Sequence, residues 1–119
     1  MLQKKLKWIN KKMPSKGMLL DIGGGTGDFL LEAKKDGWKI QGVEPSETAR
    51  AHANSKGVDL IPNTENLRSN SFDVITMWHV LEHVYDLKAQ IIELEHLLKK
   101  GGLLVIAVPN FKSYDAEYY

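Results

Sequence analysis

The sequence has 119 residues, a length that suits one domain with its own hydrophobic core. Hydrophobic residues make up 43% and charged residues 26%, which is ordinary for a soluble globular protein, and the net charge of +1 gives no electrostatic basis for nucleic-acid binding. The absence of cysteine excludes disulfides and thiolate metal sites. No apolar run has the length of a membrane span and no signal-peptide pattern opens the chain, so we expect a cytoplasmic protein.

Lysines are concentrated at the start of the chain. Six lie in the first sixteen positions: Lys4, Lys5, Lys7, Lys11, Lys12 and Lys16. A basic arm for nucleic acid or an anionic membrane is one interpretation. The alternative, the solvent face of an amphipathic helix, is favoured because the apolar residues keep a helical spacing of four, three and four. Those residues are Leu2, Leu6, Ile9 and Met13.

The chain then alternates between short apolar runs and amphipathic segments bounded by glycine, proline or capping residues. The expected helices cover residues 2–12, 28–35, 46–56 and 87–99. The expected strands cover residues 18–22, 39–43, 58–61, 72–77 and 103–108. This alternation predicts an α/β fold with a doubly wound, mostly parallel sheet and helices on both faces. Ligands of such sheets bind beyond the carboxyl ends of the strands.

The loop after the first expected strand is rich in glycine. Residues 19–28 read Leu-Leu-Asp-Ile-Gly-Gly-Gly-Thr-Gly-Asp, with alternating glycines at Gly23, Gly25 and Gly27. Glycine is needed where the backbone turns with positive φ or where a ligand lies against bare backbone. A simple strand-to-helix turn needs one or two glycines, so four in five positions favour a ligand site.

Two aspartates indicate which ligand this is. The dinucleotide fingerprint Gly-x-Gly-x-x-Gly would require glycine at position 28, where Asp28 would repel a pyrophosphate. Asp21 ends a buried strand, and a buried carboxylate needs a partner. S-adenosylmethionine carries an ammonium that could pair with it, and nicotinamide dinucleotides carry no such amine.

The segment Asp-Ile-Gly-Gly-Gly-Thr-Gly resembles the first motif of class I methyltransferases, which use S-adenosylmethionine and release S-adenosylhomocysteine. The resemblance implies that Asp21, Gly23, Gly25 and Gly27 contact the cofactor. Glu44 directly follows the second expected strand, where an acidic side chain can accept from both ribose hydroxyls. An acidic residue there would serve NAD equally well.

Further segments strengthen the resemblance. Pro45 stands where the family packs an apolar side chain against adenine. Residues 63–67, Asn-Thr-Glu-Asn-Leu, resemble a family segment that usually reads Asp-Ala-Glu-x-Leu, which implies adenine contact at Asn63, and we assign the adjacent Thr64 to the same site. The Asn63 side-chain carbonyl can still accept from an amine.

The segment from Phe72 to Val84 is similar to the Phe-Asp-x-Val … Leu-Glu-His-Val segment of the small-molecule methyltransferases of ubiquinone and menaquinone synthesis. The turn at residues 98–104 resembles their Leu-x-Pro-Gly-Gly turn, with Lys100 in place of proline. The chain is thus similar to this family from about Gly17 to Asn110. The resemblance implies a Rossmann-like fold and methyl transfer to a small-molecule acceptor.

Two histidines follow the fourth expected strand. A general base is needed only where the acceptor loses a proton, and His79 and His83 are the candidates because histidine titrates near neutrality. His79 could instead contact the cofactor, and His83 could instead order the following loop. Trp78 either stacks near the adenine or packs into the core. His79 and His83, with Glu82 between them, do not complete the metalloprotease pattern, which begins His-Glu. We therefore expect no metal.

The family builds seven strands and this sequence predicts five, so we expect the last two to be missing. We expect one domain over residues 1–119 that is truncated at its carboxyl end, where residues 109–119 begin a substrate-facing segment. The fifth strand would then lie at an unprotected edge and could pair with a second copy in a homodimer. The alternatives to an enzyme are a cofactor-binding module without catalysis and a nicotinamide-dinucleotide domain.

Overall fold

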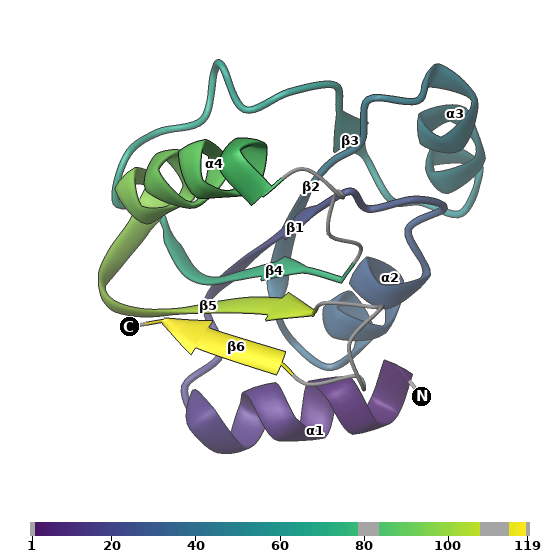
Figure 1. Cartoon of the computed structure of the whole chain (residues 1–119). Helices are drawn as coiled ribbons and strands as arrows, with labels where there is room; N and C mark the ends of the chain where they lie inside the picture. Colours follow the sequence, from purple (N-terminus) through teal and green to yellow (C-terminus); the bar gives the residue numbers. More distant parts are fainter. Residues whose placement is uncertain (1, 79–83, 108–114, 119) are drawn as a thin grey trace.

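The computed structural model describes residues 2–78, 84–107 and 115–118, and Figure 1 shows their arrangement. The elements, in chain order, are α1 (Leu2–Lys12), β1 (Met18–Ile22), α2 (Asp28–Lys35), β2 (Lys39–Val43), α3 (Glu47–Ser55), β3 (Leu60–Ile61), β4 (Phe72–Met77), α4 (Val84–Leu97), β5 (Leu98–Ala107) and β6 (Asp115–Tyr118). The strands form one sheet in the order β3-β2-β1-β4-β5-β6. Strands β1 to β5 pair in parallel, which confirms the Rossmann-like fold class.

The sheet differs from the expectation at its β5 side. β6 pairs antiparallel with β5, from Leu104 opposite Tyr118 to Ala107 opposite Asp115. The expectation that the fifth strand forms an unprotected edge is therefore wrong, because β6 pairs with its outer side over residues 104–107. The strand count rises to six, and the edge that was to pair with a second copy is covered.

Strand β5 also begins earlier than expected, at Leu98 in place of residue 103. Leu98 is opposite Phe72, and the register shifts before Leu103 becomes the partner of Val74. The Gly101-Gly102 pair thus lies within an irregular stretch of strand. A glycine pair is an ordinary stop signal for a helix, so a strand that extends across it was not expected.

Both faces of the sheet are buried, and successive residues of a strand point to opposite faces. On β1, Leu19 belongs to the core cluster that α1, α2 and α3 cover, whereas Leu20 belongs to the cluster that α4 covers. On β5, Leu103 and Leu104 divide in the same way. Figure 1 shows α1 and α4 on opposite sides of the sheet, as a doubly wound fold requires. No helix among the described residues is long and apolar enough to cross a bilayer.

Asp73 of the Phe-Asp-x-Val motif anchors the start of β1. Its Oδ2 accepts a hydrogen bond of 2.8 Å from the Met18 backbone N–H and lies 3.4 Å from Lys99 Nζ. The preceding residue, Gly17, leaves room for this carboxylate, because a Cβ atom there would lie 2.1 Å from Asp73 Oδ2. The motif aspartate thus holds β1 beside β4 at the amino ends of the strands.

We expect Asp73→Ala to lower the free energy of unfolding by about 1–3 kcal/mol, because the Met18 N–H loses its charged acceptor. Chemical denaturation measures this change. The exposed Asp59 provides a matched control, and Asp59→Ala should stay within about 0.5 kcal/mol of the unmodified chain. Equal effects of the two substitutions would contradict the anchoring role.

Candidate functional site

The glycine loop connects the carboxyl end of β1 to the start of α2. Gly23, Gly25 and Gly27 have φ values of +74°, +59° and +82°, a region that favours glycine. A Cβ atom on Gly23 or Gly25 would meet no heavy atom within 4 Å, whereas one on Gly27 would lie 3.1 Å from Ala53 Cβ. Gly23 and Gly25 therefore present bare backbone to open space, and Gly27 allows α2 to approach α3.

Backbone hydrogen bonds hold this loop against the end of β2. The N–H groups of Gly23 and Gly24 both donate to the Val43 carbonyl, at 2.7 and 3.0 Å. The next amide, of Gly25, donates to Glu44 Oε1 at 2.8 Å. Three successive amides of the loop are thus fixed by one strand end.

The half-buried Glu44 carboxylate joins two loops. Besides the Gly25 amide, it accepts a hydrogen bond of 2.9 Å from the Ser46 N–H through Oε2. Arg50 of α3 donates through Nη1 to the carbonyls of Glu44 and Pro45, each at 2.8 Å. The predicted ribose-binding acid is therefore held in position by contacts on both its side chain and its backbone.

Asp21 lies at the end of β1 with a relative exposure of 2%. Thr76 of the adjacent strand β4 donates a hydrogen bond of 2.7 Å from Oγ1 to Asp21 Oδ1. Burial raises the pKa of Asp21 to about 7, although the Thr76 hydrogen bond and the Lys5 charge act in the opposite direction. A cationic group placed beside Asp21 would favour its ionised form.

Asp28 at the start of α2 is exposed and ionic. Lys56 Nζ lies 2.6 Å from its Oδ1, and Thr26 donates to its Oδ2 at 3.1 Å. The hydrogen bond from Lys56 lowers the pKa of Asp28 below its usual value. A fixed negative charge at the first turn of α2 opposes the placement of a pyrophosphate there.

The other predicted cofactor residues occupy more distant positions. Pro45 is exposed beside Glu44. Asn63 is exposed after β3, and its Oδ1 accepts from the Glu65 N–H at 3.1 Å. The Thr64 hydroxyl is hydrogen-bonded to the Glu93 carboxylate of α4. The described contacts thus join the glycine loop to Glu44, whose charge also acts on Asp21, but they do not link Asn63 or Thr64 to that group.

Trp78 follows β4 and packs against the core cluster on the α1 side. Its ring meets Phe29 edge to face, with centroids 5.2 Å apart, and Lys5 Nζ lies 4.4 Å from the ring centroid. The indole N–H is buried, and within the described part of the chain it has no hydrogen-bond acceptor. Trp78 therefore packs against the core, and its indole N–H is a buried donor without a described acceptor.

Lys5 and Thr76 are the residues near Asp21 that the sequence analysis missed. Lys5 precedes the buried Ile9 by four positions, so helical spacing would have placed it near the buried edge of α1. Thr76 belongs to no recognised motif position, and only its position opposite Asp21 in the sheet shows that it is a neighbour of this carboxyl. His79 and His83 lie outside the described residues. Among the described residues, no group of three or more acidic or histidine side chains could hold a metal ion.

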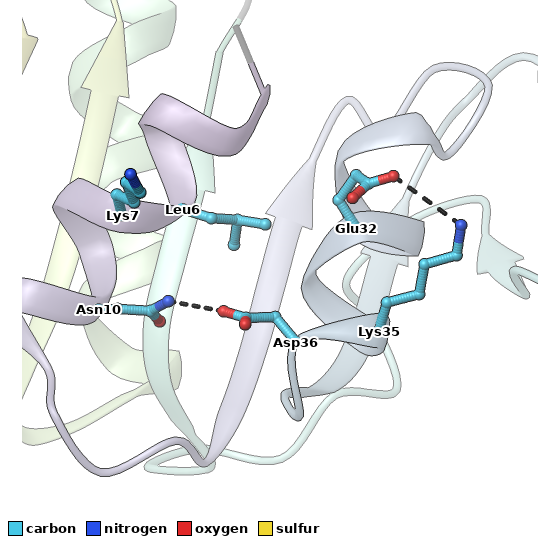
Figure 2. Close-up of a pocket in the computed structure, with 6 residues that line it drawn as sticks. All are labelled: Leu6, Lys7, Asn10, Glu32, Lys35 and Asp36. Carbon is cyan, nitrogen blue, oxygen red and sulfur yellow. Dashed lines mark hydrogen bonds and ion pairs between the residues drawn. The ribbon is translucent and has the colours of Figure 1, made fainter.

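A separate surface pocket of about 300 Å³ lies between α1 and α2 (Figure 2). Its lining residues are Leu6, Lys7, Asn10, Glu32, Lys35 and Asp36, none of which belongs to the predicted site. Asn10 donates to Asp36 at 2.6 Å, and Lys35 lies 3.9 Å from Glu32, so polar groups of the pocket already pair with one another. We interpret the pocket as the solvent-filled seam between two packed helices.

The residues at the carboxyl ends of β1 and β2 fit S-adenosylmethionine. A buried carboxyl suits the ammonium, bare glycine backbone allows close approach, and each Glu44 oxygen keeps acceptor capacity for a ribose hydroxyl. The charge on Asp28 disfavours the pyrophosphate of a dinucleotide.

Comparison with known proteins agrees with this geometry. The profile of a family described as "Methyltransferase domain" matches residues 2–118. The ubiquinone biosynthesis O-methyltransferase of Coxiella burnetii is 31% identical over 131 residues, covering 96% of this chain and 56% of that protein. The chain spans about half the length of the curated relatives it matches.

Two crystal structures are similar to most of this chain. The PH0226 protein of Pyrococcus horikoshii has a TM-score of 0.79 at 20% identity, covering 88% of this chain and 55% of that protein. An S-adenosylmethionine-dependent methyltransferase from Thermotoga maritima has a TM-score of 0.68 at 33% identity, covering 90% of this chain and 51% of that protein. The chain therefore belongs to the methyltransferase domain family, within the class I group of proteins that use S-adenosylmethionine.

Proposed function

We propose that this chain binds S-adenosylmethionine at the carboxyl ends of β1, β2 and β4, and that its protein transfers the methyl group to a small-molecule acceptor. The main support is that the buried carboxyl of Asp21 comes just before the bare backbone at Gly23 and Gly25, and that Glu44 accepts a hydrogen bond from the Gly25 amide. In this assignment Asp21 binds the ammonium and Glu44 accepts from the ribose.

The adenine end of the cofactor is assigned to residues beyond Glu44. Pro45 would pack on the adenine ring, and Asn63 would accept from its amino group through the second lone pair of Oδ1. Thr64, Trp78 and His79 complete the assignment. The unpaired Trp78 indole N–H is a donor that a ligand could satisfy.

When bound, S-adenosylmethionine supplies an electrophilic methyl group that passes to the acceptor as its bond to sulfur breaks. Asp21 and the glycine loop then act by orientation, since they fix one end of the cofactor so that an acceptor can approach the methyl group in line. His79 or His83 would take the acceptor's proton where the acceptor loses one.

A second candidate is cofactor binding without catalysis by this chain alone. The chain spans about half the length of its curated relatives, so activity has to be tested on this chain itself. Methyl transfer to any acceptor would rule it out. A nicotinamide-dinucleotide domain is disfavoured by Asp21 and Asp28. A cytoplasmic location is a further proposal, from the sequence alone.

Calorimetric titration tests the cofactor first. We expect saturable binding of S-adenosylhomocysteine and none of NADH, because the site offers a carboxyl for an ammonium and a negative charge where a pyrophosphate would lie. Binding of NADH in preference to S-adenosylhomocysteine would overturn the assignment.

Gly25→Ala should weaken S-adenosylhomocysteine binding by about tenfold or more, because the new Cβ enters the space where the cofactor would lie. Gly101 provides the matched control, since its φ is +82° and a Cβ there also meets no atom within 4 Å. Gly101→Ala carries similar backbone strain but lies at the amino ends of the strands. The affinity of this variant for S-adenosylhomocysteine should stay within about twofold of that of the unmodified chain. Equal losses in both variants would indicate a general effect of strain.

The affinity for S-adenosylhomocysteine distinguishes the roles of the two histidines. We expect His79→Ala to weaken S-adenosylhomocysteine binding more than His83→Ala does, because His79 follows the end of β4 more closely. The same calorimetric titration measures both variants. Equal affinities in both variants and the unmodified chain would contradict a cofactor contact at His79.

A further inference from the structure

Asp21 and Thr76 form a hydrogen-bonded polar pair among the mostly apolar buried residues of the sheet. They are directly opposite each other in the parallel register of β1 and β4. Their relative exposures are 2% and 0%, and they are the buried polar residues among the described side chains. A hydroxyl in this position has to find its partners within the protein, because water does not reach it.

The Thr76 hydroxyl has two acceptors within reach. It lies 2.7 Å from Asp21 Oδ1 and 3.5 Å from the Leu20 carbonyl oxygen. With Asp21 ionised, the hydroxyl proton points to the carboxylate. With Asp21 protonated, the carboxyl can donate to Thr76 Oγ1, and the threonine proton can turn to the Leu20 carbonyl. Threonine therefore satisfies both charge states of Asp21, and valine would satisfy neither.

The charged groups that act on Asp21 come from two other elements. Lys5 of α1 favours the ionised form, and Glu44 at the end of β2 opposes it. Burial has the largest effect and raises the pKa of Asp21, and the Thr76 hydrogen bond is the strongest influence against it. Loss of that hydrogen bond would therefore shift the carboxyl further toward its neutral form.

We propose that Thr76 is a positioning residue of the cofactor site, whose hydroxyl orients Asp21 and holds it ionised for the cofactor's ammonium. This inference rests on the proposed assignment of Asp21 to that ammonium. Because the ammonium selects ionised Asp21, cofactor binding near neutral pH releases a proton from the protein. Affinity then rises with pH until Asp21 is fully ionised.

The test is calorimetric titration with S-adenosylhomocysteine between pH 6 and 8, in two buffers of different ionisation enthalpy. The difference between the buffers gives the number of protons released. For the unmodified chain, a pKa of about 7 predicts an affinity gain of about tenfold from pH 6 to pH 8. Proton release should be close to half a proton at pH 7.

Thr76→Val keeps the side-chain shape and removes the hydroxyl. Its affinity curve should shift to higher pH, with weaker binding and more proton release at pH 7 than in the unmodified chain. Thr76→Ser keeps a hydroxyl and should therefore show the affinity curve and the proton release of the unmodified chain. Thr48→Val, at an exposed threonine of α3, is the control and should match the unmodified chain.

Asp21→Asn separates this proposal from the underlying assignment. It should bind weakly at every pH and lose the pH dependence, whereas a dependence that came from histidines would persist. Tight, unchanged binding in Asp21→Asn would overturn the assignment of Asp21 itself. Weak binding in Asp21→Asn, together with identical curves for Thr76→Val and the unmodified chain, would overturn only the role of Thr76.

The ligand-free protein gives an independent reading. A carboxyl whose pKa is raised on folding stabilises the fold most below its unfolded value of 3.8, and that stability is lost as pH rises through about 7. The urea midpoint of the unmodified chain should therefore fall from pH 4 to pH 8 more than that of Asp21→Asn. Thr76→Val should extend the fall to higher pH, and a midpoint profile like that of the unmodified chain would count against the proposal.

Discussion

Parallel pairing places the carboxyl ends of neighbouring strands at the same edge of the sheet, and the candidate site depends on this alignment. β1 lies between β2 and β4, so Asp21 at one strand end has Glu44 and Thr76 as close neighbours from the two adjacent strands. The same pairing buries both faces of the sheet, which leaves the edge as the place where polar side chains can gather. Fold and site thus follow from one geometric constraint.

Two aspartates illustrate how position in a strand decides the role of a residue. Asp73 lies at the amino end of β4, where its carboxylate accepts from a backbone amide and has Lys99 nearby, so its contacts are structural. Asp21 lies at the carboxyl end of β1, buried with a single hydroxyl as its described hydrogen-bond donor. The first carboxylate is satisfied by the fold, and the second retains capacity for a partner from outside it.

Much of the fold could be predicted from the sequence because its strands are short apolar runs with clear stops. Strands β1, β2 and β4 have the bounds that were expected, since glycine, proline or polar turns flank each of them. β5 and β6 could not be predicted in the same way, because pairing with a neighbouring strand decides where they begin. Local composition carries no information about that pairing.

The residue types of the candidate site could be predicted from the sequence, whereas the contacts between its residues could not. The glycines and two acidic residues follow from motif spacing. The Thr76 hydroxyl and Lys5 do not, because each reaches Asp21 only through contacts between elements distant in the chain. A motif names the residues that meet a ligand, whereas the groups that tune them are visible only in three dimensions.

The close approach of Gly17 to Asp73 has a consequence for how this sequence can evolve. Positions 17 and 73 are separated by more than fifty residues, yet a single carboxylate fills the space that any side chain at position 17 would need. A side chain at position 17 therefore displaces the Asp73 carboxylate and costs its hydrogen bond with the Met18 N–H, unless position 73 has already changed. The order of the two substitutions matters, and relatives that have replaced one residue should tend to have replaced the other.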